Sequence, residues 1–402
     1  MGSPSPTLLL LSHPPAIFCG IDLLTFTTNP KFQGIKNIPP GWHLLYVSET
    51  ADVSLREGFW FYVPNPSSYE GDPPLLLYVW DRERGGLVPC RSGSDDYNRY
   101  HSETIAQERL TPYRQSAAPD GEEQREDYWP DLTRQITPAL LTRFTGNSDW
   151  KITTASSAPQ DRDDIPGLSA TEARFGDEES ELGVLGIDLK RTWREGAIGR
   201  ERTEGRLDTS WTLENVVCQF ADEMGEGARW GTVMLGEMEV AFLLVLTVAN
   251  WSCLEEWKRC VGIVLGCKTA IITHEPFFTT FLSLLQRQLE RCEDVEGGLF
   301  DMSDDGAAWL KGLLKTFKRT LGEVFGEGEG EGGEVKEQMG ELEEWARGAY
   351  GWEVGGEFVR KGMLELEDGE VVEMEVEEME VEEMEGDGEE ERGEYAPVVV
   401  EL

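Results

Sequence analysis

Residues 41–63 read GWHLLYVSETADVSLREGFWFYV and contain two runs that are rich in aromatic and β-branched residues. Such runs are typical of β-strands, because branched and aromatic side chains pack well on a pleated surface. A third run of this kind, LLLYVW, occupies residues 75–80. We therefore predict that the first part of the chain is a domain built from β-strands.

Turn signals separate these runs. Pro39, Pro40 and Gly41 precede the first run, and there proline presets φ while glycine can adopt the positive φ that a tight turn requires. RERGG at residues 82–86 can reverse the chain into LVPC. We therefore predict an antiparallel β-sandwich-like domain. Short helices should pack on it, one of them with Thr137 as N-cap and Pro138 at its first position.

After residue 207 the apolar residues recur at helical spacing. Met238–Val248 is apolar on nearly all sides and should form a central, buried helix. Short connections between successive helices predict an antiparallel helical domain, with a last helix around Leu342–Trp352. The five helices expected before it lie around Trp211–Phe220, Met238–Val248, Leu254–Leu265, Pro276–Leu289 and Trp309–Phe317.

These patterns place the chain in the α+β class and divide it into four segments. Residues 1–148 are the N-terminal β-sandwich-like domain, and residues 208–352 are the all-α helical domain. Residues 149–207 are poor in apolar side chains and are predicted to be a linker. Residues 353–402 are an acidic low-complexity tail that ends in a β-prone segment, and we expect this tail to be disordered when alone.

The chain is strongly acidic, with 77 Asp and Glu residues against 36 Lys and Arg residues and a formal net charge of -41. This charge argues against direct binding to nucleic acid, whose phosphates would be repelled, and favours a basic protein surface as the partner. Residues 363–394 hold 17 acidic residues and one basic residue. A general acidic chaperone for basic nucleic-acid-binding proteins is therefore one functional hypothesis.

The sequence ends in EYAPVVVEL, residues 394–402. Val398, Val399 and Val400 have high β-propensity, but a single strand needs a neighbour for its backbone hydrogen bonds. We predict that these valines and Glu401 add to an exposed sheet edge of a partner, with the acidic tract as a soluble tether. Docking of the valines onto this protein's own N-terminal sheet is the alternative.

The sequence shows no arrangement typical of a catalytic, cofactor-binding or metal site, and we expect none. Cys253, Cys260 and Cys267 are spaced by seven residues, which predicts a buried helical stripe rather than a zinc site. A cysteine-dependent hydrolase built on Cys253 or Cys260 is a further alternative. No histidine is paired with another at metal-ligating spacing. The four histidines are His13, His43, His101 and His274.

Two features bear on the cellular compartment. The seven cysteines are odd in number and scattered, which favours a reducing environment over a disulfide framework. The longest apolar run, Val240–Ala249, is about half as long as a membrane span. We therefore expect a soluble, intracellular protein.

Residues 19–48, CGIDLLTFTTNPKFQGIKNIPPGWHLLYVS, closely resemble the N-terminal signature of the AAR-two (a-one alpha-two repression) family of splicing factors. In that family, G-I-D, P-K-F-x-G-x-K and I-P-P-G-x-H occur in this order. We expect the signature to be mainly structural, because its glycines and prolines suit turns and Phe32 suits the sheet core. The matching residues are Gly20, Ile21, Asp22, Pro30, Lys31, Phe32, Gly34, Lys36, Ile38, Pro39, Pro40, Gly41 and His43.

The second half shows the same resemblance. LGEMEVAFLLVLTVANWSCLEEWKRCVGIVLGC, residues 235–267, is similar to the family's C-terminal domain, and the terminal APVVVEL resembles the ending of its animal members. Trp257 lies on the apolar stripe of its helix and is expected to be structural. Lys258 and Arg259 beside it are predicted to be exposed and to contact the partner. The acidic repeats depart from the family pattern.

The resemblance implies a non-enzymatic assembly factor, or chaperone, of the U5 snRNP in pre-mRNA splicing. Family members bind the spliceosomal scaffold protein, pre-mRNA-processing factor eight, at its RNase H-like and Jab/MPN-like domains. This binding delays the attachment of RNA and of the spliceosomal helicase, and so precedes tri-snRNP assembly. The resemblance also implies a location in cytoplasm and nucleus, and we expect the free protein to be monomeric.

Overall fold

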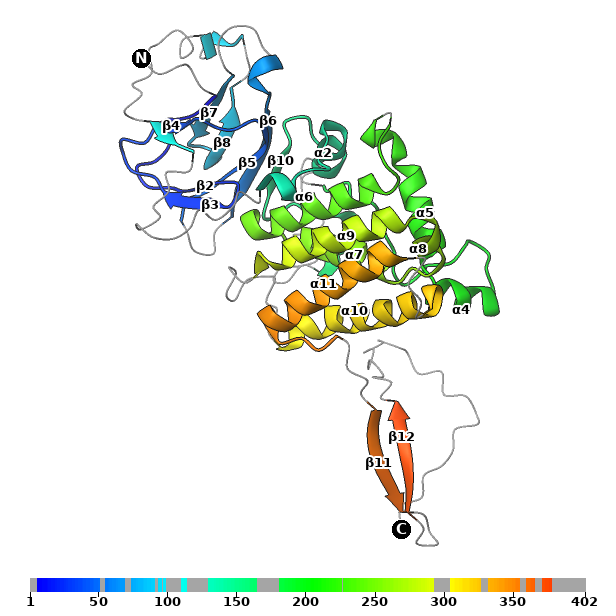
Figure 1. The fold of residues 1–402 in the computed structure, drawn as a ribbon. Coiled ribbons are helices and arrows are strands. Elements are labelled where there is room, and N and C mark those ends of the chain that lie inside the picture. Colours follow the sequence, from blue (N-terminus) through cyan, green and yellow to red (C-terminus); the bar gives the residue numbers. More distant parts are fainter. Residues whose placement is uncertain are drawn as a thin grey trace, which may run out of the picture. The chain divides into compact units, whose positions relative to one another are not determined.

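The computed structural model describes thirteen segments and divides into two units, Met1–Val354 and Gly355–Leu402. In the first unit, strands come first and helices follow (Figure 1). The described segments are residues 6–50, 55–68, 74–90, 93–95, 97–98, 110–113, 129–164, 181–225, 227–292, 304–326, 332–354, 359–365 and 371–377.

Two five-stranded sheets form the N-terminal β-sandwich. From edge to edge, the first sheet consists of β8 (Gly86–Pro89), β7 (Leu75–Asp81), β1 (Thr7–Leu11), β4 (Gly34–Lys36) and β9 (Leu110–Pro112). The second sheet consists of β10 (Lys151–Thr153), β6 (Glu57–Val63), β5 (Gly41–Ser48), β2 (Phe18–Ile21) and β3 (Leu24–Thr27).

The predicted sandwich-like domain is confirmed, with one addition to its topology. All pairs in the second sheet are antiparallel. In the first sheet, however, β1 pairs with β7 and β4 pairs with β9 in parallel. Each of these pairs is joined by a long connection that passes through the second sheet, so the chain can return in the same direction.

Strands β5 and β6 are buried on both faces. Leu45 and Phe59 lie in the core between the two sheets. Leu44 and Trp60, one position along each strand, lie in a core that the sandwich shares with the helices. Burial of both faces explains why these strands read as nearly continuous apolar runs.

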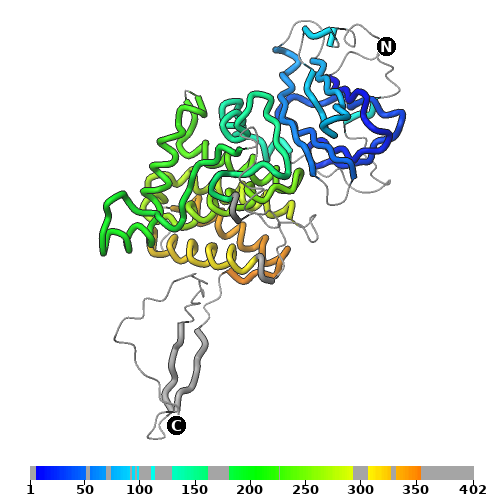
Figure 2. Tube along the Cα trace, turned by 180° about the vertical axis from the view of Figure 1, so that it is seen from behind, coloured from blue at the N-terminus to red at the C-terminus, as the bar shows by residue number. Residues whose placement is uncertain are grey.

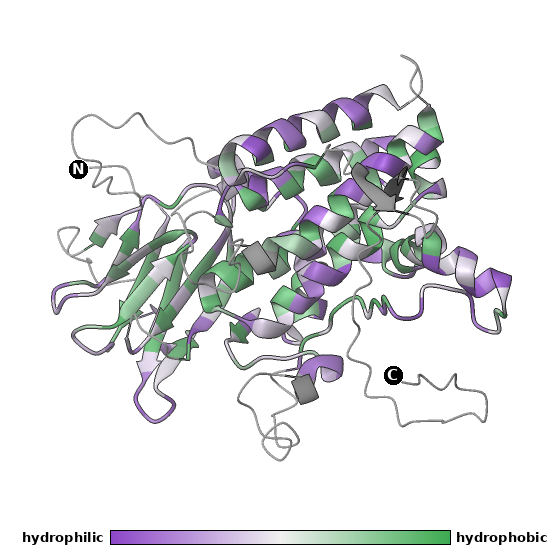
Figure 3. Ribbon diagram, turned by 90° about the horizontal axis from the view of Figure 1, so that it is seen from below, coloured by the Kyte–Doolittle hydropathy of each residue, from purple (hydrophilic) through white to green (hydrophobic). Residues whose placement is uncertain are grey.

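All of the predicted helical segments are confirmed. The hydrophilic residues of the helices lie mainly on their outer faces (Figure 3). Thr137 caps the helix that begins at Pro138, since its Oγ1 accepts a hydrogen bond from the amide of Leu140 at 3.1 Å. The helices are α2 (Pro138–Thr145), α4 (Arg200–Leu207), α5 (Ser210–Gln219), α6 (Thr232–Val248), α7 (Trp251–Leu265), α8 (Thr269–Thr273), α9 (Glu275–Leu289), α10 (Asp304–Phe325) and α11 (Gly333–Tyr350).

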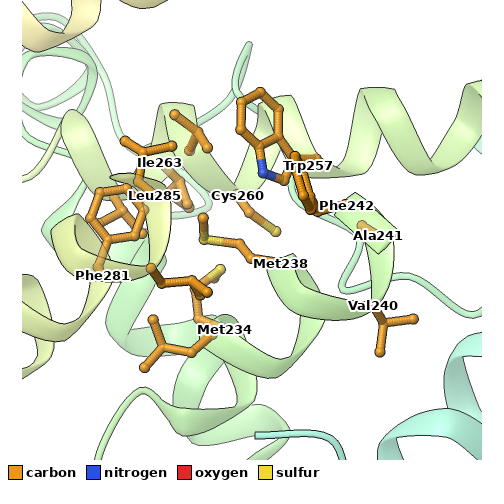
Figure 4. Packing of buried hydrophobic residues seen from close by; sticks show 14 of the residues in the cluster. Met234, Met238, Val240, Ala241, Phe242, Trp257, Cys260, Ile263, Phe281 and Leu285 are labelled. Carbon is orange, nitrogen blue, oxygen red and sulfur yellow. The ribbon is translucent and has the colours of Figure 1, made fainter. Parts of the chain in front are cut away.

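Helix α6 is the centre of the helical domain and is buried on nearly all sides, in agreement with its apolar composition. It packs against α2, α7 and α9. Figure 4 shows Met238 and Phe242 of α6 beside Trp257 of α7 and Leu285 of α9. These side chains pack α6, α7 and α9 together around one core.

The segment that we interpret as a linker, residues 149–207, contains parts of both domains (Figure 2). Its strand β10 pairs with β6, and Ile152 of that strand is buried. A 3-10 helix, η4 (Pro159–Asp164), and helix α4 follow. A strand of three residues is too short to show a period in the sequence, which is why local composition does not identify it.

The second unit contains a hairpin that the sequence analysis does not predict. Strands β11 (Val359–Glu365) and β12 (Val371–Glu377) pair antiparallel. Glu at every second position, with Met and Val between, gives β12 the period of two that a strand requires. The predicted terminal strand, Val398 to Val400, lies outside the described residues. None of the described helices is long and apolar enough to cross a membrane.

Candidate functional site

The carboxylate of Asp22 ties the N-terminal signature together. Its Oδ1 accepts a hydrogen bond from the amide of Leu44 at 2.9 Å, and its Oδ2 lies 2.8 Å from Nδ1 of His43. The hydroxyl of Tyr113, which follows β9, also donates to Asp22. Nε2 of His43 donates to the carbonyl oxygen of Pro39 at 2.8 Å. These buried contacts join both sheets and the turn before β5, so Asp22 and His43 have a structural role.

Two signature glycines allow neighbouring chain segments to approach closely. A Cβ atom on Gly20 would lie 2.1 Å from Cζ of the buried Tyr46. A Cβ atom on Gly34 would lie 2.0 Å from the carbonyl oxygen of Leu8 in the neighbouring strand. Any larger residue at these positions would collide with the sandwich, so both glycines are structural.

The other signature residues differ in exposure. Pro30, Lys31 and Pro40 are exposed, so a partner can reach them. Phe32 is buried and packs edge-to-face on Phe26, with 5.2 Å between ring centroids. The remaining members are buried or half-buried: Ile21, Lys36, Ile38, Pro39 and Gly41.

Trp257 and Lys258 of α7 have different surroundings. Trp257 is buried, and its Nε1 donates to Oε1 of Gln288 in α9 at 2.8 Å. Lys258 is 40% exposed, pairs with Glu255 at 3.0 Å and lies over the ring of Trp251. Trp257 therefore stabilises helix packing, and Lys258 is accessible to a partner.

Arg259 corrects one prediction, because it is largely buried rather than exposed. Only 17% of its side chain is exposed. Its guanidinium forms an ion pair with Asp161 of η4, and a second with Glu256 at 3.1 Å. Asp161 is 98 residues away in the chain, so local sequence does not reveal this pairing. Arg259 anchors the segment after β10 to α7, and we withdraw it as a contact residue.

Buried carboxylates in the helical domain form a second set of internal contacts, around Leu185, which we call the Leu185 brace. Oε1 of Glu237 and Oε1 of Glu256 both accept from the amide of Leu185, at 3.1 and 3.3 Å. Arg143 of α2 donates to Oε2 of Glu237 at 2.7 Å. Burial, with the nearby charge of Glu237, raises the pKa of Glu256 to about 8. The brace fixes the chain around Leu185 against α6 and α7, and sequence reasoning missed it because acidic residues are so abundant here.

The cysteine stripe is buried, as the spacing predicts. Cys253 and Cys260 of α7 and Cys267 just beyond it are inaccessible and free. Burial raises the pKa of the Cys253 and Cys260 thiols well above the ordinary value, which disfavours the thiolate that a nucleophile requires. The hydrolase alternative therefore finds no support at these cysteines. Within the described segments, no group of ligating side chains could hold a metal ion.

A groove of about 820 Å³ opens on the helical domain at the start of α6. We call it the Trp230 groove. The rings of Trp230 and His274 stack face to face, with centroids 3.5 Å apart and an interplanar angle of 2°. Phe277 meets Trp230 edge-on at 5.0 Å. The groove combines the α6 start, the α8–α9 junction and the chain before α2, so no single stretch of sequence indicates it.

Two protein-family models match the chain, and they fall on the two folded domains. The model described as the AAR2 N-terminal domain matches residues 4–146. The model described as the AAR2 C-terminal repeat region matches residues 185–355. The matches thus cover the sandwich and the helical domain.

Curated proteins named "Protein AAR2 homolog" are similar to the chain over both domains. The proteins of Macaca fascicularis and Homo sapiens are 25% and 24% identical over 313 residues, which cover 70% of this chain and 75% of each relative. The Caenorhabditis elegans protein is 24% identical over 306 residues, covering 71% of this chain and 78% of its own length.

Proposed function

Because the chain belongs to the AAR2 family, whose members are splicing-related factors, we propose that it is a non-enzymatic assembly factor of the U5 snRNP. In this proposal it binds pre-mRNA-processing factor eight, the spliceosomal scaffold, at its RNase H-like and Jab/MPN-like domains. Binding delays the arrival of RNA and of the spliceosomal helicase. The protein acts in the cytoplasm and the nucleus.

The observation that carries the proposal is the match of both folded domains to one family. The two domains are joined within a single unit, since Arg56 donates to the carbonyl oxygen of Thr247 at 2.7 Å and Thr154 donates to that of Val248 at 2.7 Å. A pair of domains fixed in this way can engage two domains of a partner at the same time. Simultaneous engagement strengthens binding without a new contact.

The charge of the chain supports a protein partner rather than RNA. A net charge of -41 repels phosphates but complements a basic, RNA-binding protein surface. Covering such a surface would keep RNA away from it. We further propose that Val398, Val399 and Val400 add as a strand to a sheet edge of the scaffold, where main-chain hydrogen bonds supply affinity.

A general acidic chaperone is the second candidate, favoured by the 17 acidic residues of segment 363–394. Deletion of residues 363–393 separates the two candidates, because the folded unit Met1–Val354 is left intact. The assembly factor should keep much of its binding to the scaffold after this deletion. The acidic chaperone should lose its binding to basic proteins.

Affinity purification of the tagged full chain from cell extract, followed by identification of the bound proteins, tests the proposal. We expect the scaffold protein among them, and less of it when residues 395–402 are removed. If the full chain does not retain the scaffold, the proposed function is wrong.

A further inference from the structure

The Trp230 groove has an apolar floor made of large side chains. Trp230 is half-buried, and its ring packs between His274 and Phe277. Leu235 and Met224 also line the groove. A volume of about 820 Å³ lies within the usual range of about 300–1,000 Å³ for ligand sites, so it can hold a few residues of a peptide.

The charge of this groove is opposite to that of the chain. Acidic residues outnumber basic ones by 77 to 36 in the sequence, yet no Asp or Glu is among the described residues that line the groove, whereas Arg134 and Arg229 are. The described residues that line the groove therefore include basic side chains but no acidic ones.

The two arginines are not equivalent. Arg134 forms an ion pair with Asp131, which lies in the adjoining depression, and this pair partly compensates its charge. Arg229 is exposed and has no ion-pair partner among the residues that the structure describes. Burial lowers the pKa of His274, which favours its neutral form. The carboxylate of Glu214 acts in the opposite direction on the pKa of His274, so the positive charge without an ion-pair partner among the described lining residues is that of Arg229.

We propose that the Trp230 groove docks a short acidic peptide segment of a partner protein, with a carboxylate on Arg229 and the neighbouring apolar side chain on Trp230 and Phe277. Arginine binds carboxylates through two parallel hydrogen bonds. Buried Trp and Arg residues also dominate the energetics of protein interfaces. A nucleic-acid strand fits less well, because it carries a phosphate at every nucleotide, whereas a peptide can place a single carboxylate on Arg229 beside apolar side chains. This inference goes beyond the proposed function and does not depend on it.

The test is fluorescence polarisation of the full chain with a short fluorescein-labelled peptide in which glutamates alternate with phenylalanine and leucine. A second probe replaces the glutamates with lysines. We expect the acidic probe to bind and the lysine probe not to bind. We expect Arg229→Glu to weaken binding of the acidic probe about tenfold or more, since a charge-assisted contact is replaced by repulsion.

Arg191→Glu is the matched control, because Arg191 is also exposed but is not among the residues that line the groove. This control should bind the acidic probe as the unchanged protein does. Trp230→Ala should also weaken binding, with its thermal unfolding measured to show that it is folded. The inference is overturned if the unchanged protein does not bind the acidic probe, or if Arg229→Glu and Arg191→Glu bind it equally. Neither result bears on retention of the splicing scaffold.

Discussion

Asn250 serves both domains with one side chain. Its Oδ1 caps α7 by accepting from the amide of Cys253 at 2.9 Å. Its Nδ2 donates to the carbonyl oxygens of Thr153 and Ser156, at 2.9 and 2.7 Å, on the segment that begins with β10. Removing this buried amide leaves the two carbonyl oxygens and the amide of Cys253 without a hydrogen-bond partner. Unsatisfied buried polar groups lower the free energy of unfolding.

Asn250→Ala should therefore lower the free energy of unfolding by about 2–3 kcal/mol, from the lost cap and the unsatisfied carbonyls. Urea denaturation of the two proteins measures this difference. Asn65→Ala is the control, since Asn65 is exposed, and it should change stability by less than about 0.5 kcal/mol. Equal stabilities of the two variants would show that Asn250 does not join the domains as described.

Gly20 and Gly312 lead to opposite expectations for the same substitution. Gly20→Ala places a methyl group 2.1 Å from Cζ of Tyr46, so it should cost about 1–3 kcal/mol through overpacking. Gly312 lies within α10 with no atom near its would-be Cβ, so Gly312→Ala should stabilise the helix by about 0.5–1 kcal/mol. Thermal unfolding of both variants measures these two changes in stability. Stabilisation by Gly20→Ala would contradict the close approach of residue 20 to Tyr46.

At the scale of elements, α6 is unusual because it carries buried carboxyl groups into the helical core. Burial raises the pKa of Glu239 from 4.5 to about 8, although its Oε2 accepts from the amide of Gln135 at 2.8 Å. Between pH 4.5 and 8 the folded protein keeps this proton while the unfolded chain loses it. Glu239 therefore lowers stability progressively as pH rises through this window.

Glu239→Gln removes this titration while keeping an oxygen for the amide of Gln135. Its stability relative to the unchanged protein should rise between pH 4.5 and 8, by on the order of 4 kcal/mol. Denaturant unfolding at several pH values measures this gain. Glu334→Gln, at an exposed site on α11, should show no such trend. A pH-independent difference for Glu239→Gln would mean that this carboxyl group is ionised in the folded protein.

The elements that local sequence predicts are those with a distinctive composition or a clear period. Strands β5 and β6 follow from aromatic and β-branched runs, and α6, α7 and α9 from helical spacing. Strand β1 does not follow, because its run of four leucines lacks the aromatic residues of β5 and β6 and is equally compatible with a buried helix. The parallel pairing of β1 with β7 depends on contacts far apart in the chain, which no local pattern records.

The candidate site was less predictable than the fold for the same reason. The signature residues are identifiable by type and order, but only the structure shows that Lys31 is exposed while Arg259 is held by Asp161. The Trp230 groove joins residues from three separate regions of the chain. Sites of this kind depend on tertiary arrangement rather than on spacing.

At the scale of the whole molecule, two domains share one buried core, and the sequence as a whole is strongly acidic. Both domains match one family, and their shared core presents them as one body. Such a body suits a factor that holds two domains of a scaffold together. The net charge of -41 suits the covering of a basic surface.

The most direct test of this account is the binding of the purified full chain to a purified segment of the spliceosomal scaffold that contains its RNase H-like and Jab/MPN-like domains, measured by co-elution in size-exclusion chromatography. We predict a stoichiometric complex that forms without RNA, and that weakens when residues 395–402 are removed. Elution of the two proteins as separate peaks at micromolar concentration would contradict the proposed role as an assembly factor of the U5 snRNP.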